Sequence, residues 1–89
     1  DSLDFAAAVR ELEARGHRRL LCEGGPGVLA QVVAAGLLDD LCLTLSPLLL
    51  AGRPARILDG RPFAVPAELS LAHVVQDEDF LFLRYTRSR

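Results

Sequence analysis

A glycine-rich segment, residues 23–29, carries the residue types best suited to bind an anion. It reads Glu-Gly-Gly-Pro-Gly-Val-Leu and follows an apolar run, so the glycines lie where a strand would pass into a helix. The first N–H groups of a helix have no partner within the helix, and the helix dipole adds about half a positive charge there. Because Pro26 has no N–H, the predicted donors are the amides of Gly25, Gly27 and Val28.

This segment matches neither of two well-known phosphate-binding motifs. A Walker A loop needs a Lys followed by Ser or Thr, and the dinucleotide fingerprint needs the spacing Gly-x-Gly-x-x-Gly. The segment has neither pattern. Two interpretations therefore stay open at this point: the turn binds an anion, or the glycines only make a tight connection between a strand and a helix.

Glu23 comes one residue before the glycine turn, at the end of the predicted strand. Open α/β sheets place ligands at the carboxyl ends of their strands. A carboxylate there would repel a phosphate, but it accepts hydrogen bonds from N–H or O–H groups of a neutral ligand beside it. The alternative is a solvated side chain, or one paired with Arg18 or Arg19.

The two histidines are expected to have structural roles. His17 follows Gly16, which is expected to end a helix, and so should lie on the surface. His73 has the strand spacing of Leu69 and Leu71, which predicts a core or interface histidine on their face. The sequence indicates no catalytic proton donor.

The two cysteines, Cys22 and Cys42, lie in apolar stretches and are expected to be buried free thiols. With two histidines and no Cys-x-x-Cys pair in the chain, no metal site is expected. Three arginines of the long loop, Arg53, Arg56 and Arg61, could contact a ligand phosphate, although solvated charges are the more common outcome.

Two helices and four strands are predicted to position these residues. The helices are expected over residues 3–14, capped by Asp1 or Ser2, and over about ten residues from Pro26. The strands are expected over residues 18–23, 41–46, 69–75 and 80–85, with Leu41, Leu43 and Leu45 on one face and an irregular connection over 48–66.

This order predicts an α/β fold. Strand 18–23, the second helix and strand 41–46 should form a right-handed parallel βαβ unit. The last two strands should form an antiparallel hairpin. Four strands and two helices cover a parallel sheet incompletely, and the chain has no Met at its start, so we expect residues 1–89 to be the C-terminal part of one larger domain.

Composition excludes several classes of partner. The 89 residues are 51% hydrophobic and carry a formal net charge of −2, which indicates a globular domain and argues against binding to nucleic acid or anionic membranes. No apolar run approaches the ~20 residues that span a bilayer, and residues 1–4 do not resemble the start of a secretory signal. A cytoplasmic location is expected.

Three segments together resemble a known family. They are residues 21–26 (Leu-Cys-Glu-Gly-Gly-Pro), residues 34–47 with their Ala-Gly-Leu-Leu-Asp-Asp-Leu core, and residues 80–85 (Phe-Leu-Phe-Leu-Arg-Tyr). They resemble the C-terminal half of the riboflavin-biosynthesis reductase domain, also called the RibD C-terminal domain, whose fold is similar to dihydrofolate reductase. The resemblance covers most of the chain and is weakest over residues 48–66.

The resemblance implies an NADPH-dependent reduction of a phosphoribosylaminopyrimidine, in which the ribose ring opens to a ribityl chain. By position, Glu23 would contact the substrate, and the NADPH phosphate would bind the turn formed by Gly24, Gly25, Pro26, Gly27, Val28 and Leu29. Family members usually dimerise, with C-terminal strands in the contact, so a homodimer is expected.

The family domain is about twice as long as this chain, so the 89 residues alone are expected to be inactive. Two other functions stay open at this stage. One is a dihydrofolate-reductase-like oxidoreductase of another pterin-like substrate, and the other is a non-catalytic α/β dimerisation domain.

Overall fold

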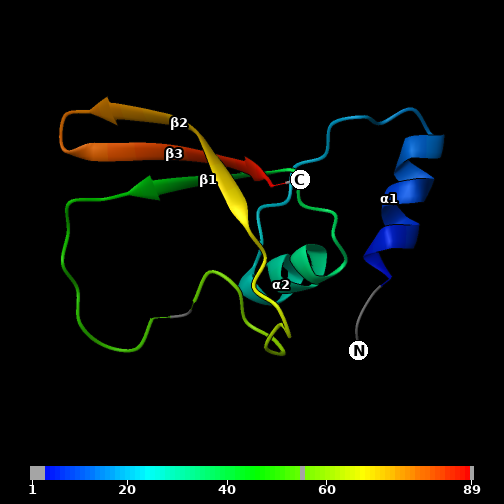
Figure 1. The fold of residues 1–89 in the computed structure, drawn as a ribbon, viewed down its shortest axis with the longest axis horizontal. Helices are drawn as coiled ribbons and strands as arrows, with labels where there is room; N and C mark the ends of the chain where they lie inside the picture. Colours follow the sequence, from blue (N-terminus) through cyan, green and yellow to red (C-terminus); the bar gives the residue numbers. More distant parts are fainter. Residues whose placement is uncertain (1–3, 55, 89) are drawn as a thin grey trace. The chain divides into compact units, whose positions relative to one another are not determined.

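The structure, a computed structural model, describes residues 4–54 and 56–88 and contains two helices and three strands (Figure 1). In chain order these are α1 (Phe5–Ala14), α2 (Pro26–Ala34), β1 (Asp40–Leu45), β2 (Leu69–Asp77) and β3 (Phe80–Arg87). The chain divides into two compact units. The first holds both helices and residues 56–64 of the long loop, and the second holds the three strands and the rest of that loop.

Helix α1 begins at Phe5 because Asp4 caps it. The Asp4 Oδ1 atom accepts a hydrogen bond of 3.0 Å from the Ala7 N–H, which satisfies one amide of the first turn. The caps predicted from the sequence, Asp1 and Ser2, lie outside the described residues.

Both helices end in the same way, at a glycine with a positive φ angle. Gly16 has φ +91° and Gly36 has φ +71°, and at each the N–H of the following residue reaches back to a carbonyl of the last turn. These bonds are His17 N–H to the Leu12 carbonyl (3.0 Å) and Leu37 N–H to the Val32 carbonyl (3.1 Å). The predicted role of Gly16 as a left-handed helix end is confirmed.

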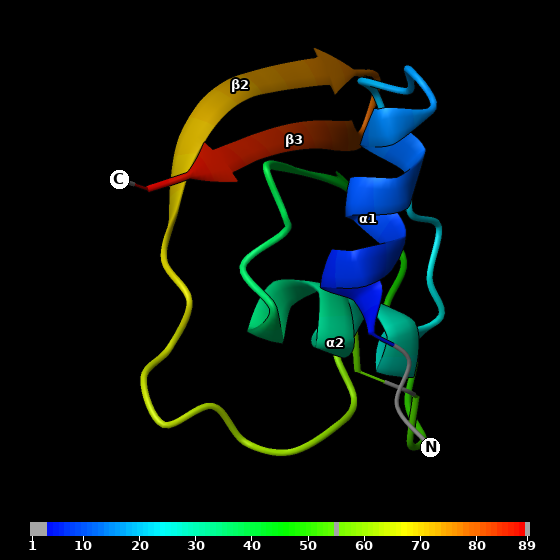
Figure 2. The same cartoon turned by 90° about the vertical axis from the view of Figure 1, so that its right-hand side faces the viewer.

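The second unit is a three-stranded sheet in the order β1-β3-β2 (Figures 1 and 2). Both neighbouring pairs are antiparallel. The β2–β3 pair is the C-terminal hairpin that the sequence predicts, and it turns through Glu78, a non-glycine residue with φ +53°. Leu41, Leu43 and Leu45 alternate along β1 and therefore share one face, as expected.

The predicted strand over residues 18–23 is wrong. These residues have no strand structure, and Leu21 is 84% exposed. The expected parallel βαβ unit is also wrong for the described residues, because β1 pairs antiparallel with β3 and no parallel pair occurs in them. The backbone groups of a strand need a neighbouring strand, and an apolar run of sequence does not show which neighbour is available. The α/β class itself is confirmed.

The predicted position of His73, on the face of Leu69 and Leu71, is wrong because β2 contains a bulge. Leu71 pairs with Tyr85, but the register shifts by one residue before His73, which pairs with Arg84. The extra residue is Ala72, and a shift of one residue moves every following side chain to the opposite face of a strand. His73 therefore lies on the face opposite Leu71, and it is exposed.

Burial is slight among the described residues, where Ala30 of α2, at 7% exposure, is the one buried hydrophobic residue. Both cysteines are exposed, which corrects the prediction of buried thiols. The segment around Cys22 has no strand neighbour, and Cys42 lies on a sheet face that other parts of its own unit leave open. In the described residues, no helix combines the length and hydropathy needed to cross a membrane.

The Asp4 cap predicts a stability difference. We expect Asp4→Ala to lower the free energy of unfolding by about 1 kcal/mol, because the Ala7 N–H loses its acceptor. Asp4→Asn keeps an acceptor oxygen and serves as the matched control, with little loss expected. The urea midpoint of each variant measures the difference, and an equal loss in both variants would show that charge, rather than the cap, matters.

Candidate functional site

The glycine turn brings the chain onto the first turn of α2. Gly25 is the N-cap residue with φ −75° and ψ −165°, and Pro26 is the first helical residue, as predicted. Gly24 has φ +90°, a region that residues with a Cβ rarely adopt, and the peptide bond between Gly24 and Gly25 is cis. No side chain caps α2, so the first helical amides are left to other partners.

The backbone donors of this turn are available to a ligand. The Leu29 N–H donates to the Gly25 carbonyl (2.9 Å) and is the first amide to form a helical bond. The amides of Gly27 and Val28 have no acceptor within the residues that the structure describes. These two are among the donors predicted from the sequence, whereas Leu29 has no amide to offer a ligand.

The glycines also leave room for a ligand. A Cβ atom at Gly25 would meet nothing within 4 Å, and one at Gly27 would meet only the Asp59 carbonyl oxygen at 3.9 Å. Both glycines are exposed. Unpaired amides, an exposed backbone and the positive end of a helix dipole fit the phosphate of a cofactor.

A segment of the long loop packs against the same helix, a contact that was not predicted from the sequence. The Asp59 N–H donates to the Pro26 carbonyl (3.1 Å), and a Cβ at Gly60 would lie 3.4 Å from the Cβ of Ala30. No short-range pattern reports a contact across some thirty residues of chain. Both residues lie in the irregular connection expected over 48–66 and had no predicted role in the site, so Asp59 and Gly60 are additions to the candidate site.

Glu23 precedes the glycine turn in an irregular segment, not at the end of a strand as predicted. Its side chain is exposed, and the predicted alternative of an ion pair with Arg18 or Arg19 is not formed. The ion pairs of the described residues are Arg15–Glu11, Arg84–Asp40 and Arg87–Asp39. The carboxylate of Glu23 is thus able to accept hydrogen bonds from a ligand.

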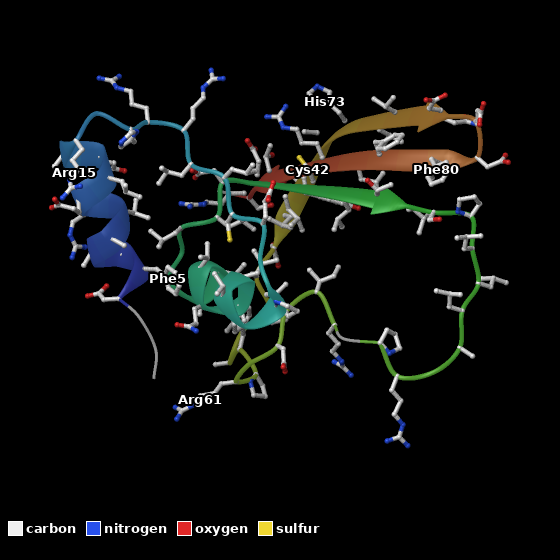
Figure 3. The ribbon with its side chains drawn as sticks, turned by 180° about the vertical axis from the view of Figure 1, so that it is seen from behind. Phe5, Arg15, Cys42, Arg61, His73 and Phe80 are labelled. Carbon is white, nitrogen blue, oxygen red and sulfur yellow. The ribbon has the colours of Figure 1, made fainter. Side chains whose placement is uncertain are left out.

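A second polar cluster lies on the sheet, around Arg84. Figure 3 labels two of its neighbours, His73 and Cys42. The Arg84 Nη1 atom lies 3.1 Å from His73 Nδ1, and its Nη2 atom lies 3.5 Å from Asp40 Oδ1. Because a guanidinium only donates, His73 Nδ1 is the acceptor of this bond. Arg84, His73 and the neighbouring Cys42 line an open depression of about 350 Å³ with Leu43, Thr44, Val75, Phe82 and Leu83.

Two further sequence candidates, Arg61 and His17, lie outside the glycine turn. The side chain of Arg61 points away from α2, although the backbone of the preceding Gly60 packs on it (Figure 3). His17 is exposed at the end of α1, as predicted. The described residues contain no group of three or more His, Cys, Asp or Glu side chains able to hold a metal ion.

Comparison with known proteins identifies the class of protein and then its family. The mixed α/β structure is similar to a solved pyrimidine reductase-like protein from Corynebacterium diphtheriae, with a TM-score of 0.83 and 25% sequence identity. The match covers 100% of this chain and 37% of that one. The fold is therefore of the class to which this pyrimidine reductase-like protein belongs.

The particular family is that of the RibD C-terminal domain, whose model matches residues 2–82, and the chain belongs to it. This confirms the family and the fold resemblance inferred from the sequence. No curated protein matches the chain significantly.

The backbone of the turn predicts a contrast between two adjacent glycines. Gly24→Ser should lower the free energy of unfolding by about 1 kcal/mol or more, because a side chain is strained at φ +90°. Gly25→Ser places the same side chain in open space at an N-cap, where it should be neutral or stabilising. Thermal unfolding of both variants tests this, and equal losses would contradict it.

Proposed function

We propose that this chain holds the cofactor phosphate of an NADPH-dependent reductase that acts on a phosphoribosylaminopyrimidine, as 5-amino-6-(5-phosphoribosylamino)uracil reductases do. The observation that carries the proposal is the pair of unpaired amides, Gly27 and Val28, at the N-terminus of α2 in a chain of the RibD C-terminal family. The family supports a reductase, and the geometry supports a phosphate contact.

The turn would hold the phosphate through its backbone. Gly24, Gly25, Pro26, Gly27, Val28 and Leu29 form the proposed cofactor-binding set. In it, Gly24 reverses the chain, Gly25 and Gly27 leave space for the phosphate oxygens, and the amides of Gly27 and Val28 donate to them. Bound NADPH supplies the hydride, and the role of these residues is to hold it in place.

Glu23 is the proposed substrate contact. Its carboxylate stands one residue from the phosphate turn and has no protein partner among the described residues. It would accept hydrogen bonds from the N–H groups of the pyrimidine or the O–H groups of the ribose chain. The Glu23 carboxylate would thus bind the uncharged part of the substrate, while the amides of the turn would bind the anionic phosphate of the cofactor.

The reaction is assigned to the gene-encoded protein and not to these 89 residues alone, because the chain spans 37% of the length of its structural relative. A cytoplasmic homodimer belongs to the same proposal. The exposed Phe80 and Phe82 of β3 support a contact through the C-terminal strands, because exposed aromatic side chains favour association.

A charge placed at Gly27 tests the phosphate contact. A Glu in the first turn of a helix favours the helix but repels a phosphate, so Gly27→Glu should keep stability and weaken NADPH binding by at least about tenfold. Ala34→Glu adds the same charge to the exposed far end of α2 and should leave binding unchanged. Fluorescence titration with NADPH measures both, and equal affinities in the two variants would refute the contact.

Loss of charge at Glu23 tests the substrate contact. Glu23→Gln should raise KM for the ribosylaminopyrimidine by about tenfold or more without weakening NADPH binding, because a charge-assisted hydrogen bond is lost. Glu13→Gln, on an exposed residue of α1, is the matched control. Steady-state assays with the pyrimidine and with dihydrofolate measure the effect. Turnover of dihydrofolate alone would favour the pterin-like substrate, and turnover of neither would favour a non-catalytic domain.

A further inference from the structure

We propose that residues 57–60 of the long loop are a positioning element for the phosphate turn, with Asp59 and Gly60 setting the orientation of the first turn of α2. We call this segment the loop clasp. The inference rests on the proposed function, since it assigns part of the cofactor affinity to residues that do not touch the cofactor.

The first turn of α2 has no capping side chain. Its N-cap, Gly25, makes no side-chain hydrogen bond, and Gly24 and Gly27 add further backbone freedom. An amide can hold a phosphate well only if its direction is fixed before the ligand arrives, because ordering it on binding costs entropy. A contact from outside the turn is therefore needed.

The loop clasp supplies that contact at the first helical residue. The Asp59 N–H donates to the Pro26 carbonyl at 3.1 Å. The Asp59 carbonyl oxygen lies 3.9 Å from the position that a Cβ at Gly27 would take. The loop thus passes beside the donor amides and bonds to the residue immediately before them.

The absence of a branched side chain at Gly60 allows the loop to come this close. A Cβ at Gly60 would lie 3.4 Å from the Cβ of Ala30, which is ordinary van der Waals contact, so an alanine fits there. A β-branched side chain adds two methyl groups toward Ala30, the buried residue of α2, and would push the loop away. The contacts that define the clasp are made by the backbone of Asp59 and Gly60, and the Arg61 side chain points away from α2 (Figure 3).

The test uses the gene-encoded protein with three loop variants. Gly60→Val should raise KM for NADPH by about tenfold while kcat stays within about threefold, because only the bound phosphate loses an interaction. Gly60→Ala should resemble the unchanged protein. Ala64→Val, at an exposed position of the same loop, is the control. Adding Ala30→Gly to Gly60→Val removes the clash and should restore part of the affinity.

Hydrogen exchange separates the two proposals. The Leu29 amide, bonded to the Gly25 carbonyl, reports the order of the first turn without any ligand. Faster exchange there in Gly60→Val, together with the rise in KM, supports the loop clasp. Unchanged exchange, or an equal KM for NADPH in Gly60→Val and Ala64→Val, overturns it. Absence of NADPH binding in the unchanged protein would instead refute the proposed function.

Discussion

The N-terminus of α2 is the constraint on which the candidate site depends. A helix must begin somewhere, and its first amides must find acceptors outside it. Here the chain provides three glycines and a proline in place of a capping side chain, and the amides of Gly27 and Val28 have no acceptor in the described residues. Left without a side-chain partner, these amides are available to an anion, and the exposed backbone lets the anion come close.

The sequence predicted those features that are set by neighbouring residues. Pro26 at the first helical position and Gly16 at the end of α1 are local choices of φ angle, and both are confirmed. The β2–β3 hairpin is also local, because its strands are joined by two residues. The strand expected over residues 18–23 failed for the opposite reason, since a strand exists only beside a partner and the partner is not encoded in the run itself.

The difference between local features and contacts with distant residues also explains which parts of the site could be predicted. The glycine turn was found because strand-like and helical patterns meet there, whereas the Asp59–Pro26 bond and the Gly60–Ala30 packing join residues far apart in the chain. The sheet face of His73 was predicted wrongly because β2 contains one extra residue, Ala72. The alternation of apolar and polar residues does not indicate where a strand has a bulge. That shift places His73 beside Arg84, a pairing that simple periodicity excludes.

The proposed use of backbone amides instead of arginines for a phosphate contact has a physical rationale in this chain. Arg15, Arg84 and Arg87 are held by carboxylates, at 3.0 to 3.5 Å. A long arginine side chain loses rotamer entropy when it binds, and its charge would also attract Glu23. Amides at a helix start carry no formal charge and are already ordered when a clasp such as Asp59 fixes the turn. In the proposed site, a neutral donor set would therefore let the Glu23 carboxylate face a ligand beside the bound phosphate.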